Sequence, residues 1–299
     1  MALGSERLAR AYEACTALAR SHYENFPVAS LLLPAPMRPH VAAVYAFARI
    51  ADDIADEGNA PAADRLVRLG RWQQGLHAAV ANGSQDAPAS SDDGHDLILI
   101  AVAESIRAKK LPLALFDDLV SAFGQDTTTT RYDSWEHVFD YCRRSANPVG
   151  RLVLRIAGYT VDELDRSSDA FCTALQLTNF WQDFGRDYAA GRVYVPREVS
   201  HRFGATEDAL RSGDVGQPWV HAMSECIRVT RELFERGRRV CDGVAGRLRF
   251  ELRLTWHGGM RILERVSTRN DRFMLERPAL GAGDVPTLIA RTIRWQALS

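Results

Sequence analysis

Apolar residues recur every three or four positions through most of the chain, which is the spacing of one face of an α-helix. Runs in which apolar and polar residues alternate, as strands require, are scarce. The pattern therefore predicts an all-α protein. The predicted helices cover residues 5–21, 37–57, 62–81, 95–108, 112–124, 134–157, 161–188, 217–244, 247–268 and 284–297.

Turn-forming residues interrupt this pattern at a few points. Residues 82–94 are rich in Ser, Asp, Gly and Pro and predict an exposed loop, and residues 191–196 predict a flap that follows a long acidic helix. Neither stretch is long or distinctive enough to link two domains, so we predict one domain over residues 1–299. Pro148 falls within a predicted helix and should kink it near Arg144.

A polar stripe runs along the predicted helix 37–57. Its members share one helical face through the spacing i, i+4, i+7 and i+11: Tyr45, Arg49, Asp52 and Asp56. Apolar residues surround the stripe, which argues against a solvated surface helix that happens to carry charge. Asp53 lies about 100° around the helix from Asp52 and is a weaker candidate ligand.

A second stripe repeats this arrangement in the predicted helix 161–188. Its members are spaced at i, i+3, i+7 and i+11: Gln176, Asn179, Asp183 and Asp187. Two such helices facing each other would gather four carboxylates, which repel one another strongly unless cations separate them. Oxygen-only ligands favour Mg²⁺, which substrate phosphates often complete. The paired stripes therefore predict a site for a metal-bridged diphosphate.

Other chemistries fit the sequence less well. A single Asp-x-x-x-Asp pair on a helix is more often a solvated face, but two pairs in apolar helices favour a functional site. A di-iron bundle would need Glu-x-x-His pairs, and the sequence has none. The phosphate-loop and dinucleotide-binding signatures are also absent.

Charge and cysteine content restrict the partners and the compartment. Lys and Arg total 37 against 38 Asp and Glu, which gives a net charge of -1 and no general basic field for a nucleic acid. Five widely spaced cysteines without a CxxC pair, and a polar N-terminal stretch, predict a cytoplasmic protein. The longest purely apolar run, Leu97–Ala103, is far shorter than the roughly 20 residues that cross a bilayer.

The predicted helix 284–297 leaves two interpretations open. Its apolar stripe consists of Val285, Leu288, Ile289 and Ile293, with Arg291, Arg294 and Trp295 nearby. A helix lying on a membrane surface has this pattern, which would place the protein at the inner membrane face. A helix docked on the protein core has it too, and we favour that interpretation.

Several motifs together resemble the squalene and phytoene synthase family over nearly the whole chain. The resemblance starts at His22 and Phe26 and ends near Arg277. The motifs are LLLP, YAFARIADDIAD, YCRRSANPVGRLVL, QLTNFWQDFGRD, GRVYVP and LERPAL. It implies an isoprenoid-synthase-type helical bundle around a central apolar cavity, which binds prenyl diphosphates through Mg²⁺ and joins or rearranges them head to head.

The resemblance also implies roles for individual residues. The catalytic, metal-binding aspartates would be Asp52, Asp56, Asp183 and Asp187. The substrate-binding residues would be Tyr45, Arg49, Gln176 and Asn179 beside the diphosphate, with Arg192, Tyr194 and Arg277 closing over it. Simpler roles are surface ion pairs for the arginines, core positions for the tyrosines and a helix-end cation for Arg277.

Departures from the family pattern narrow the expected reaction. Gln182 replaces an arginine, Arg186 replaces an acidic residue, and residues 23–25 replace a Ser-basic-Ser run. Such losses should weaken binding of a second prenyl diphosphate. The chain thus most resembles the bacterial branch of the family that serves hopanoid biosynthesis. This resemblance implies that other squalene-pathway enzymes are neighbouring partners.

This resemblance implies Mg²⁺-dependent conversion of presqualene diphosphate and water to hydroxysqualene and pyrophosphate, without NADPH, by a carbon-oxygen lyase or prenyl transferase. One alternative is a condensing synthase that makes presqualene diphosphate, squalene or a phytoene-type product from two prenyl diphosphates. Another, from a different class, is a helical protein that binds a lipid diphosphate without turnover.

Overall fold

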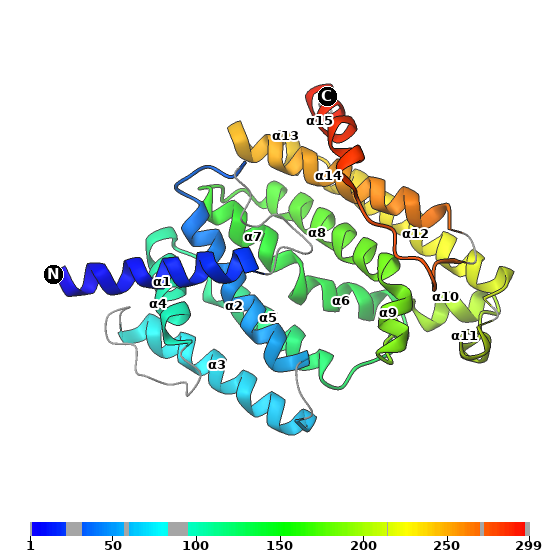
Figure 1. Ribbon diagram of the computed structural model, residues 1–299, viewed down its shortest axis with the longest axis horizontal. Coiled ribbons are helices and arrows are strands. Elements are labelled where there is room, and N and C mark those ends of the chain that lie inside the picture. Colours follow the sequence, from blue (N-terminus) through cyan, green and yellow to red (C-terminus); the bar gives the residue numbers. More distant parts are fainter. Residues whose placement is uncertain are drawn as a thin grey trace. The chain divides into compact units, whose positions relative to one another are not determined.

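The computed structural model describes residues 2–21, 32–56, 60–82, 95–213, 215–269 and 272–296. Helices account for the regular structure of these residues and confirm the all-α prediction (Figure 1). The exception there is an isolated parallel bridge between Arg131 and Val193. Most of the predicted loop 82–94 and the motif residues 22–26 lie outside the described residues.

The helices follow one another in chain order. They are α1 (Ala2–Ser21), α2 (Arg38–Asp56), α3 (Ala62–Asn82), α4 (Asp96–Lys109), α5 (Leu113–Asp126), α6 (Trp135–Ser145), α7 (Asn147–Ile156), α8 (Asp162–Gln182), α9 (Phe184–Ala189), α10 (Arg197–Arg202), α11 (Glu207–Ser212), α12 (Gln217–Gly237), α13 (Val240–Gly243), α14 (Gly246–Ser267), the 3₁₀ turn η2 (Ala282–Asp284) and α15 (Val285–Ile293).

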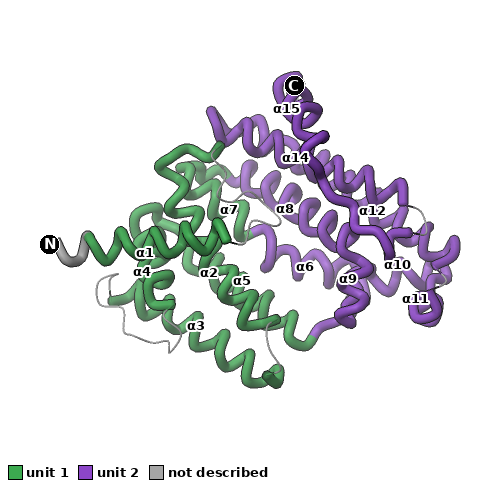
Figure 2. The backbone as a smooth tube through the Cα atoms, viewed as in Figure 1, with its two compact units in different colours: residues 1–128, 148–161 green, residues 129–147, 162–299 purple. Residues whose placement is uncertain are grey.

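Two compact units contain these helices (Figure 2). Unit 1 comprises residues 1–128 and 148–161, and unit 2 comprises residues 129–147 and 162–299. The chain passes from unit 1 to unit 2, returns, and enters unit 2 again. The prediction of one domain over residues 1–299 stays a prediction.

In unit 1, α2 is the central helix and contacts α1, α3, α4 and α5. Ten of its residues are buried: Val41, Ala42, Ala43, Val44, Ala46, Phe47, Ile50, Ala51, Ile54 and Ala55. Phe47 stacks on Trp72 with ring centroids 5.3 Å apart and meets Phe116 edge to face at 5.4 Å. Because apolar packing covers most of α2, its polar residues are confined to a narrow stripe.

In unit 2, α8 is central and packs along α12 and against α6, α13 and α14. The Trp181 indole donates a 2.8 Å hydrogen bond to the buried Thr230 hydroxyl on α12. Gly237 allows the two helices to approach closely, because a Cβ there would lie 2.5 Å from the backbone nitrogen of Phe171. These contacts hold the second polar stripe on a rigid helix.

The predicted helix 134–157 is two helices rather than one kinked helix. It breaks at Ala146, and Pro148 becomes the second residue of α7, where a missing N–H costs no helical hydrogen bond. Asn147 turns inward, and its side-chain oxygen accepts a 3.0 Å hydrogen bond from the Thr173 hydroxyl of α8. Because the helix breaks here, Asn147 forms a hydrogen bond that joins the start of α7 to α8.

Two other predicted helices are also interrupted. The predicted helix 161–188 breaks at Asp183, whose φ of −97° and ψ of 9° separate α8 from α9. The predicted helix 217–244 ends at Gly237 and resumes as α13. Helices α10 and α11 were not predicted, since six residues are too few to establish a period.

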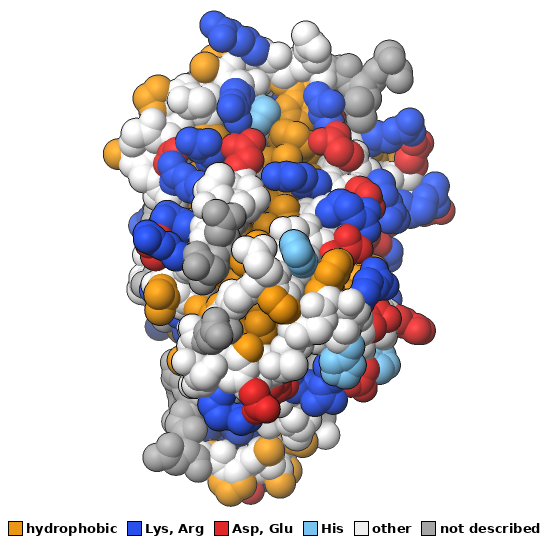
Figure 3. All heavy atoms as spheres, turned by 90° about the vertical axis from the view of Figure 1, so that its right-hand side faces the viewer, with side chains coloured by type: hydrophobic (Ala, Val, Ile, Leu, Met, Phe, Trp, Pro, Cys, Tyr) orange, Lys and Arg blue, Asp and Glu red, His pale blue; other side chains and the backbone are white. Residues whose placement is uncertain are grey.

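The described residues include no helix that combines the length and the apolar character needed to span a bilayer. On the face drawn in Figure 3, basic and acidic side chains are intermingled beside hydrophobic ones. That face therefore carries no continuous basic surface of the kind that a nucleic acid would require.

The close approach at Gly237 predicts a stability change. In Gly237→Ala the new Cβ would overlap the Phe171 backbone, and overpacking should lower the free energy of unfolding by about 1–3 kcal/mol. Gly258→Ala is the control in the same unit: its Cβ would meet only Leu280, at 3.5 Å, and alanine should stabilise α14 by up to about 1 kcal/mol. Denaturant unfolding measures both variants, and equal stabilities would contradict the close crossing.

Candidate active site

The polar stripe of α2 in unit 1 centres on Arg49. One terminal nitrogen of its guanidinium lies 2.6 Å from a carboxylate oxygen of Asp53, and the other lies 3.6 Å from Asp52. The Arg49, Asp52 and Asp53 side chains are partly buried, whereas Asp56, the last residue of α2, is exposed. Asp53 therefore belongs to this cluster, and its spacing of four residues from Arg49 was the sequence signal for it.

The surroundings of α2 keep both Arg49 and Tyr45 protonated. Burial alone would lower the pKa of Arg49, but Asp53 and then Asp52 outweigh burial and raise that pKa above its ordinary value. Burial raises the pKa of the Tyr45 hydroxyl, and the positive charge of Arg49 opposes this effect. The stripe therefore offers a permanent cation and a neutral phenol beside carboxylates.

The stripe of α8 and α9 in unit 2 is built around Asp183. Both Nε and Nη2 of Arg277 donate hydrogen bonds to its two carboxylate oxygens, the second over 3.3 Å. Only 14% of the Asp183 side chain and 26% of the Arg277 side chain are exposed. A bidentate guanidinium–carboxylate pair of this kind is among the stronger polar contacts in proteins.

Residues 273–278 are fastened to the α8–α9 junction at three further points. The Gln182 side-chain amide donates a 2.6 Å hydrogen bond to the Pro278 carbonyl. Phe273 meets Phe184 edge to face with centroids 5.1 Å apart. Gly185 has room only for a hydrogen, since a Cβ would overlap the Met274 carbonyl. Gln182, singled out in the sequence as a lost cation, thus anchors the segment that carries Arg277.

Asp187, on α9, lies beside Arg192, which belongs to the predicted flap 191–196. The Arg192 backbone N–H donates a 2.7 Å hydrogen bond to the Asp187 carbonyl, and its guanidinium comes within 3.9 Å of the Asp187 carboxylate. The Arg131 guanidinium donates a 2.6 Å hydrogen bond to the Gly191 carbonyl, and Gly191 adopts a left-handed φ of 84°. The flap is therefore tied at its base.

Tyr194 lies in an aromatic cluster of unit 2. Its ring stacks on Phe180, with centroids 3.7 Å apart and planes 4° from parallel, and also contacts Tyr132 and Tyr141. Tyr194 is only 8% exposed, so most of its surface serves packing. Gln176 and Asn179 are half-buried on α8, two turns and one turn before Asp183.

The oxygen ligands on α8 and α9 suit a magnesium ion whose coordination shell is completed by a phosphate. Asp183, Asp187 and the Asn179 amide supply oxygen atoms, and Mg²⁺ in proteins is often held by one or two carboxylates plus substrate phosphates. The described residues contain no group of three or more Asp, Glu, His or Cys side chains that could hold a metal alone. Arg277 and Arg192 beside the carboxylates show that this place already favours positive charge.

The predicted site residues therefore form two clusters. Tyr45, Arg49, Asp52 and Asp56 belong to unit 1, whereas Gln176, Asn179, Asp183, Asp187, Arg192, Tyr194 and Arg277 belong to unit 2. Each cluster places carboxylates beside arginines on a half-buried helical face. The roles of these residues toward a ligand stay predictions.

Comparisons with known proteins identify similar sequences and folds. Residues 19–284 match the model of the squalene/phytoene synthase family. Hydroxysqualene synthase of Zymomonas mobilis is 36% identical over 214 residues, which cover 71% of this chain and 68% of that protein. Phytoene synthase of Mycobacterium bovis is 30% identical over 207 residues, covering 69% of this chain and 63% of that protein.

A solved structure adds to these similarities. Squalene synthase HpnC from Alicyclobacillus acidocaldarius superposes with a TM-score of 0.80 at 40% sequence identity, and the match covers 88% of this chain and 95% of that chain. The similarity therefore extends through most of both chains.

Gln182 can be tested as the anchor of residues 273–278. In Gln182→Ala the hydrogen bond to Pro278 is lost, so amides of this segment should exchange with deuterium several-fold faster. Hydrogen–deuterium exchange with mass spectrometry measures this rate. Gln176→Ala, two turns earlier on α8, is the control and should leave the segment unchanged. Equal exchange in the two variants would contradict the anchoring role.

Proposed function

The chain belongs to the squalene/phytoene synthase family, and from this we propose that it converts presqualene diphosphate and water into hydroxysqualene and pyrophosphate with the help of Mg²⁺. One observation carries the proposal: Asp183 and Asp187 each lie beside an arginine, in a partly buried place suited to a diphosphate and its metal ions. Two relatives that are 36% and 32% identical to this chain over the aligned residues are named hydroxysqualene synthase, which supports the choice of reaction.

The arginines would bind the diphosphate directly. Arg277, held on Asp183 through Nε and Nη2, would place its guanidinium charge beside the phosphate groups. Arg192, whose guanidinium is 3.9 Å from Asp187, would add a second positive charge there. Arg49, in the α2 stripe of unit 1, is predicted to bind a phosphate group as well, since its charge is permanent. Mg²⁺ held by the aspartates would supply Lewis acidity that favours departure of pyrophosphate.

The reaction needs an initial loss of pyrophosphate and a later capture by water. The carbon–oxygen bond to the diphosphate breaks and both electrons leave with pyrophosphate. The resulting cyclopropylcarbinyl cation rearranges, and the oxygen of one water molecule forms the new carbon–oxygen bond and releases a proton. Tyr45, whose phenol stays protonated beside Arg49, is predicted to bind the substrate as well.

A condensing synthase is the second candidate, and relatives named phytoene synthase favour it. Such an enzyme binds two prenyl diphosphates and needs cations for both. Gln182 stands where a cation was expected, and its amide is occupied by the Pro278 carbonyl. This chain therefore has one positive charge fewer for a second diphosphate, which supports the first candidate.

A product assay tests the reaction. Purified protein with Mg²⁺ should form hydroxysqualene from presqualene diphosphate and leave farnesyl diphosphate unchanged, with or without NADPH. Gas chromatography with mass spectrometry identifies the products. Consumption of farnesyl diphosphate would instead indicate the condensing synthase, and no turnover of either substrate would favour a binding protein.

Replacing a site aspartate tests the proposed residues. Asp183→Asn removes a carboxylate charge while keeping the side-chain shape, so kcat should fall by about 100-fold or more. Asp208→Asn is the control, because Asp208 lies exposed on α11 and pairs with Arg211 only at the surface. Circular dichroism verifies folding, and Asp187→Asn provides a second variant if Asp183→Asn is unstable. Turnover retained in both site variants would refute the assignment.

A further inference from the structure

Within unit 2, helix α15 packs against α14 through a narrow side of its surface. Leu288 and Thr292, one turn apart, are buried where α15 packs on α14. Val285, Ile289 and Ile293 form a neighbouring stripe and are 50%, 38% and 71% exposed. The interpretation of a docked helix is therefore confirmed, whereas the membrane interpretation stays a prediction, and an apolar stripe is left uncovered by the described residues.

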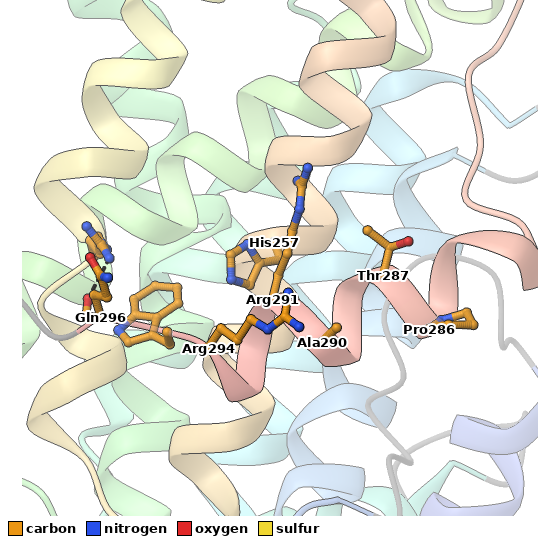
Figure 4. A pocket seen from close by; sticks show the side chains of 9 residues that line it. His257, Pro286, Thr287, Ala290, Arg291, Arg294 and Gln296 are labelled. Carbon is orange, nitrogen blue, oxygen red and sulfur yellow. Dashed lines mark hydrogen bonds between the residues drawn. The ribbon is translucent and has the colours of Figure 1, made fainter.

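A basic pocket of about 670 Å³ lies between α15, α14 and the end of α12 (Figure 4). Its charged and aromatic lining consists of Arg238, His257, Arg291, Arg294 and Trp295, and it includes no acidic side chain. The Arg238 guanidinium lies over the Trp295 ring at 4.6 Å and donates a hydrogen bond to the Gln296 carbonyl. The pocket is therefore rigid on one side and positively charged.

The arginines next to the pocket pair with carboxylates, whereas among the described residues the pocket arginines do not. Arg253 pairs with Asp242, and Arg265 pairs with Asp284, both at 2.6 Å. Within the described part of the chain, no carboxylate forms an ion pair with the pocket arginines, which are Arg238, Arg291 and Arg294. The positive charge of the pocket is thus available to an external anion.

His257 is consistent with such an anion. Its Nε2 atom is buried and has no hydrogen-bond partner among the described residues. Burial, and then the charge of Arg291, lower the pKa of His257, while a hydrogen bond with the Arg291 backbone opposes this change. A bound phosphate group would raise that pKa, and the protonated ring would then donate a hydrogen bond from Nε2 to a phosphate oxygen.

The apolar stripe and the pocket lie on two sides of one solvent-facing surface. At about 100° per residue, Ala290 lies between Ile293 and Arg294 around α15, on the side opposite to Leu288 and Thr292. A flat surface resting on Ala290 would therefore meet isoleucine side chains on one flank and arginines on the other.

We propose that α15 and its basic pocket dock on an anionic phospholipid surface. A lipid phosphate binds to Arg291 and Arg294 at the pocket, and Ile289 and Ile293 enter the boundary between headgroups and acyl chains. Phosphate contacts satisfy the arginines by charge-assisted hydrogen bonds, and the lipid buries the exposed stripe. A nucleic acid or a free phosphate would leave the isoleucines exposed, and a second copy of this basic face would leave the arginines unpaired.

Vesicle binding by the full chain tests the proposal without any prenyl substrate, so the result is separate from the reaction proposed above. The protein should sediment with vesicles of phosphatidylcholine and phosphatidylglycerol and should bind pure phosphatidylcholine at least about tenfold more weakly. The double variant Arg291→Gln/Arg294→Gln should weaken binding to the anionic vesicles by about tenfold or more. Ile289→Asn/Ile293→Asn should weaken binding to a similar degree.

The control Arg211→Gln, at an exposed arginine on α11, should bind like the unaltered protein. Circular dichroism checks that each variant is folded. Tryptophan fluorescence gives a second measurement: anionic vesicles should change it, and Trp295→Phe should reduce the change, because Trp295 is one of six tryptophans.

Three results would overturn the proposal. One is equal binding to both kinds of vesicle, or binding that neither double variant weakens. Another is saturable binding of inorganic phosphate or pyrophosphate, lost in the arginine variant, without vesicle binding, which would identify a small-anion site. The third is a dimer in solution that Ile289→Asn/Ile293→Asn dissociates while vesicles do not bind, which would identify a self-association surface.

Discussion

Carboxylates on partly buried helical faces require compensating positive charge, and this requirement organises the polar part of the molecule. On α2, Arg49 lies between Asp52 and Asp53. On α8 and α9, Arg277 and Arg192 lie beside Asp183 and Asp187. Without these cations the neighbouring carboxylates would repel one another in surroundings that are partly shielded from water.

The same requirement links the candidate site to chain segments far from it in sequence. Arg277 can reach Asp183 only because residues 273–278 lie across the α8–α9 junction, where Gln182, Phe184 and Gly185 hold them. These contacts fix the position of the Arg277 guanidinium beside the Asp183 carboxylate.

In the C-terminal part of unit 2, by contrast, some arginines lie together without carboxylates from the described residues beside them. There the arginines of the pocket have no described carboxylate partner, while Arg253 and Arg265 nearby do. Positive charge and uncovered isoleucines on α15 thus form a surface whose chemistry is complementary to an anionic lipid layer. A substrate and a product with long isoprenoid chains would give an enzyme reason to stay near such a layer.

The sequence by itself determined the helical class and most residues of both stripes, although it ranked Asp53 as a weaker candidate than the structure shows. Spacings such as Arg49 to Asp53 or Asp183 to Asp187 are about one helical turn, so the local geometry of the backbone already places those side chains together. Family motifs then added expected roles. Helix ends near Asp183 and Ala146 were less predictable, because a break depends on tertiary hydrogen bonds as well as on local residues.

Only the tertiary structure decided which distant residues meet. Arg277 and Asp183 are 94 residues apart, and no pattern in the sequence pairs them. The anchoring of Pro278 by Gln182 and the stacking of Tyr194 on Phe180 likewise depend on how separate segments fold onto α8. Exposure of one stripe of α15 and burial of the next follows from its packing on α14. These outcomes come from long-range packing, which a helical period does not encode.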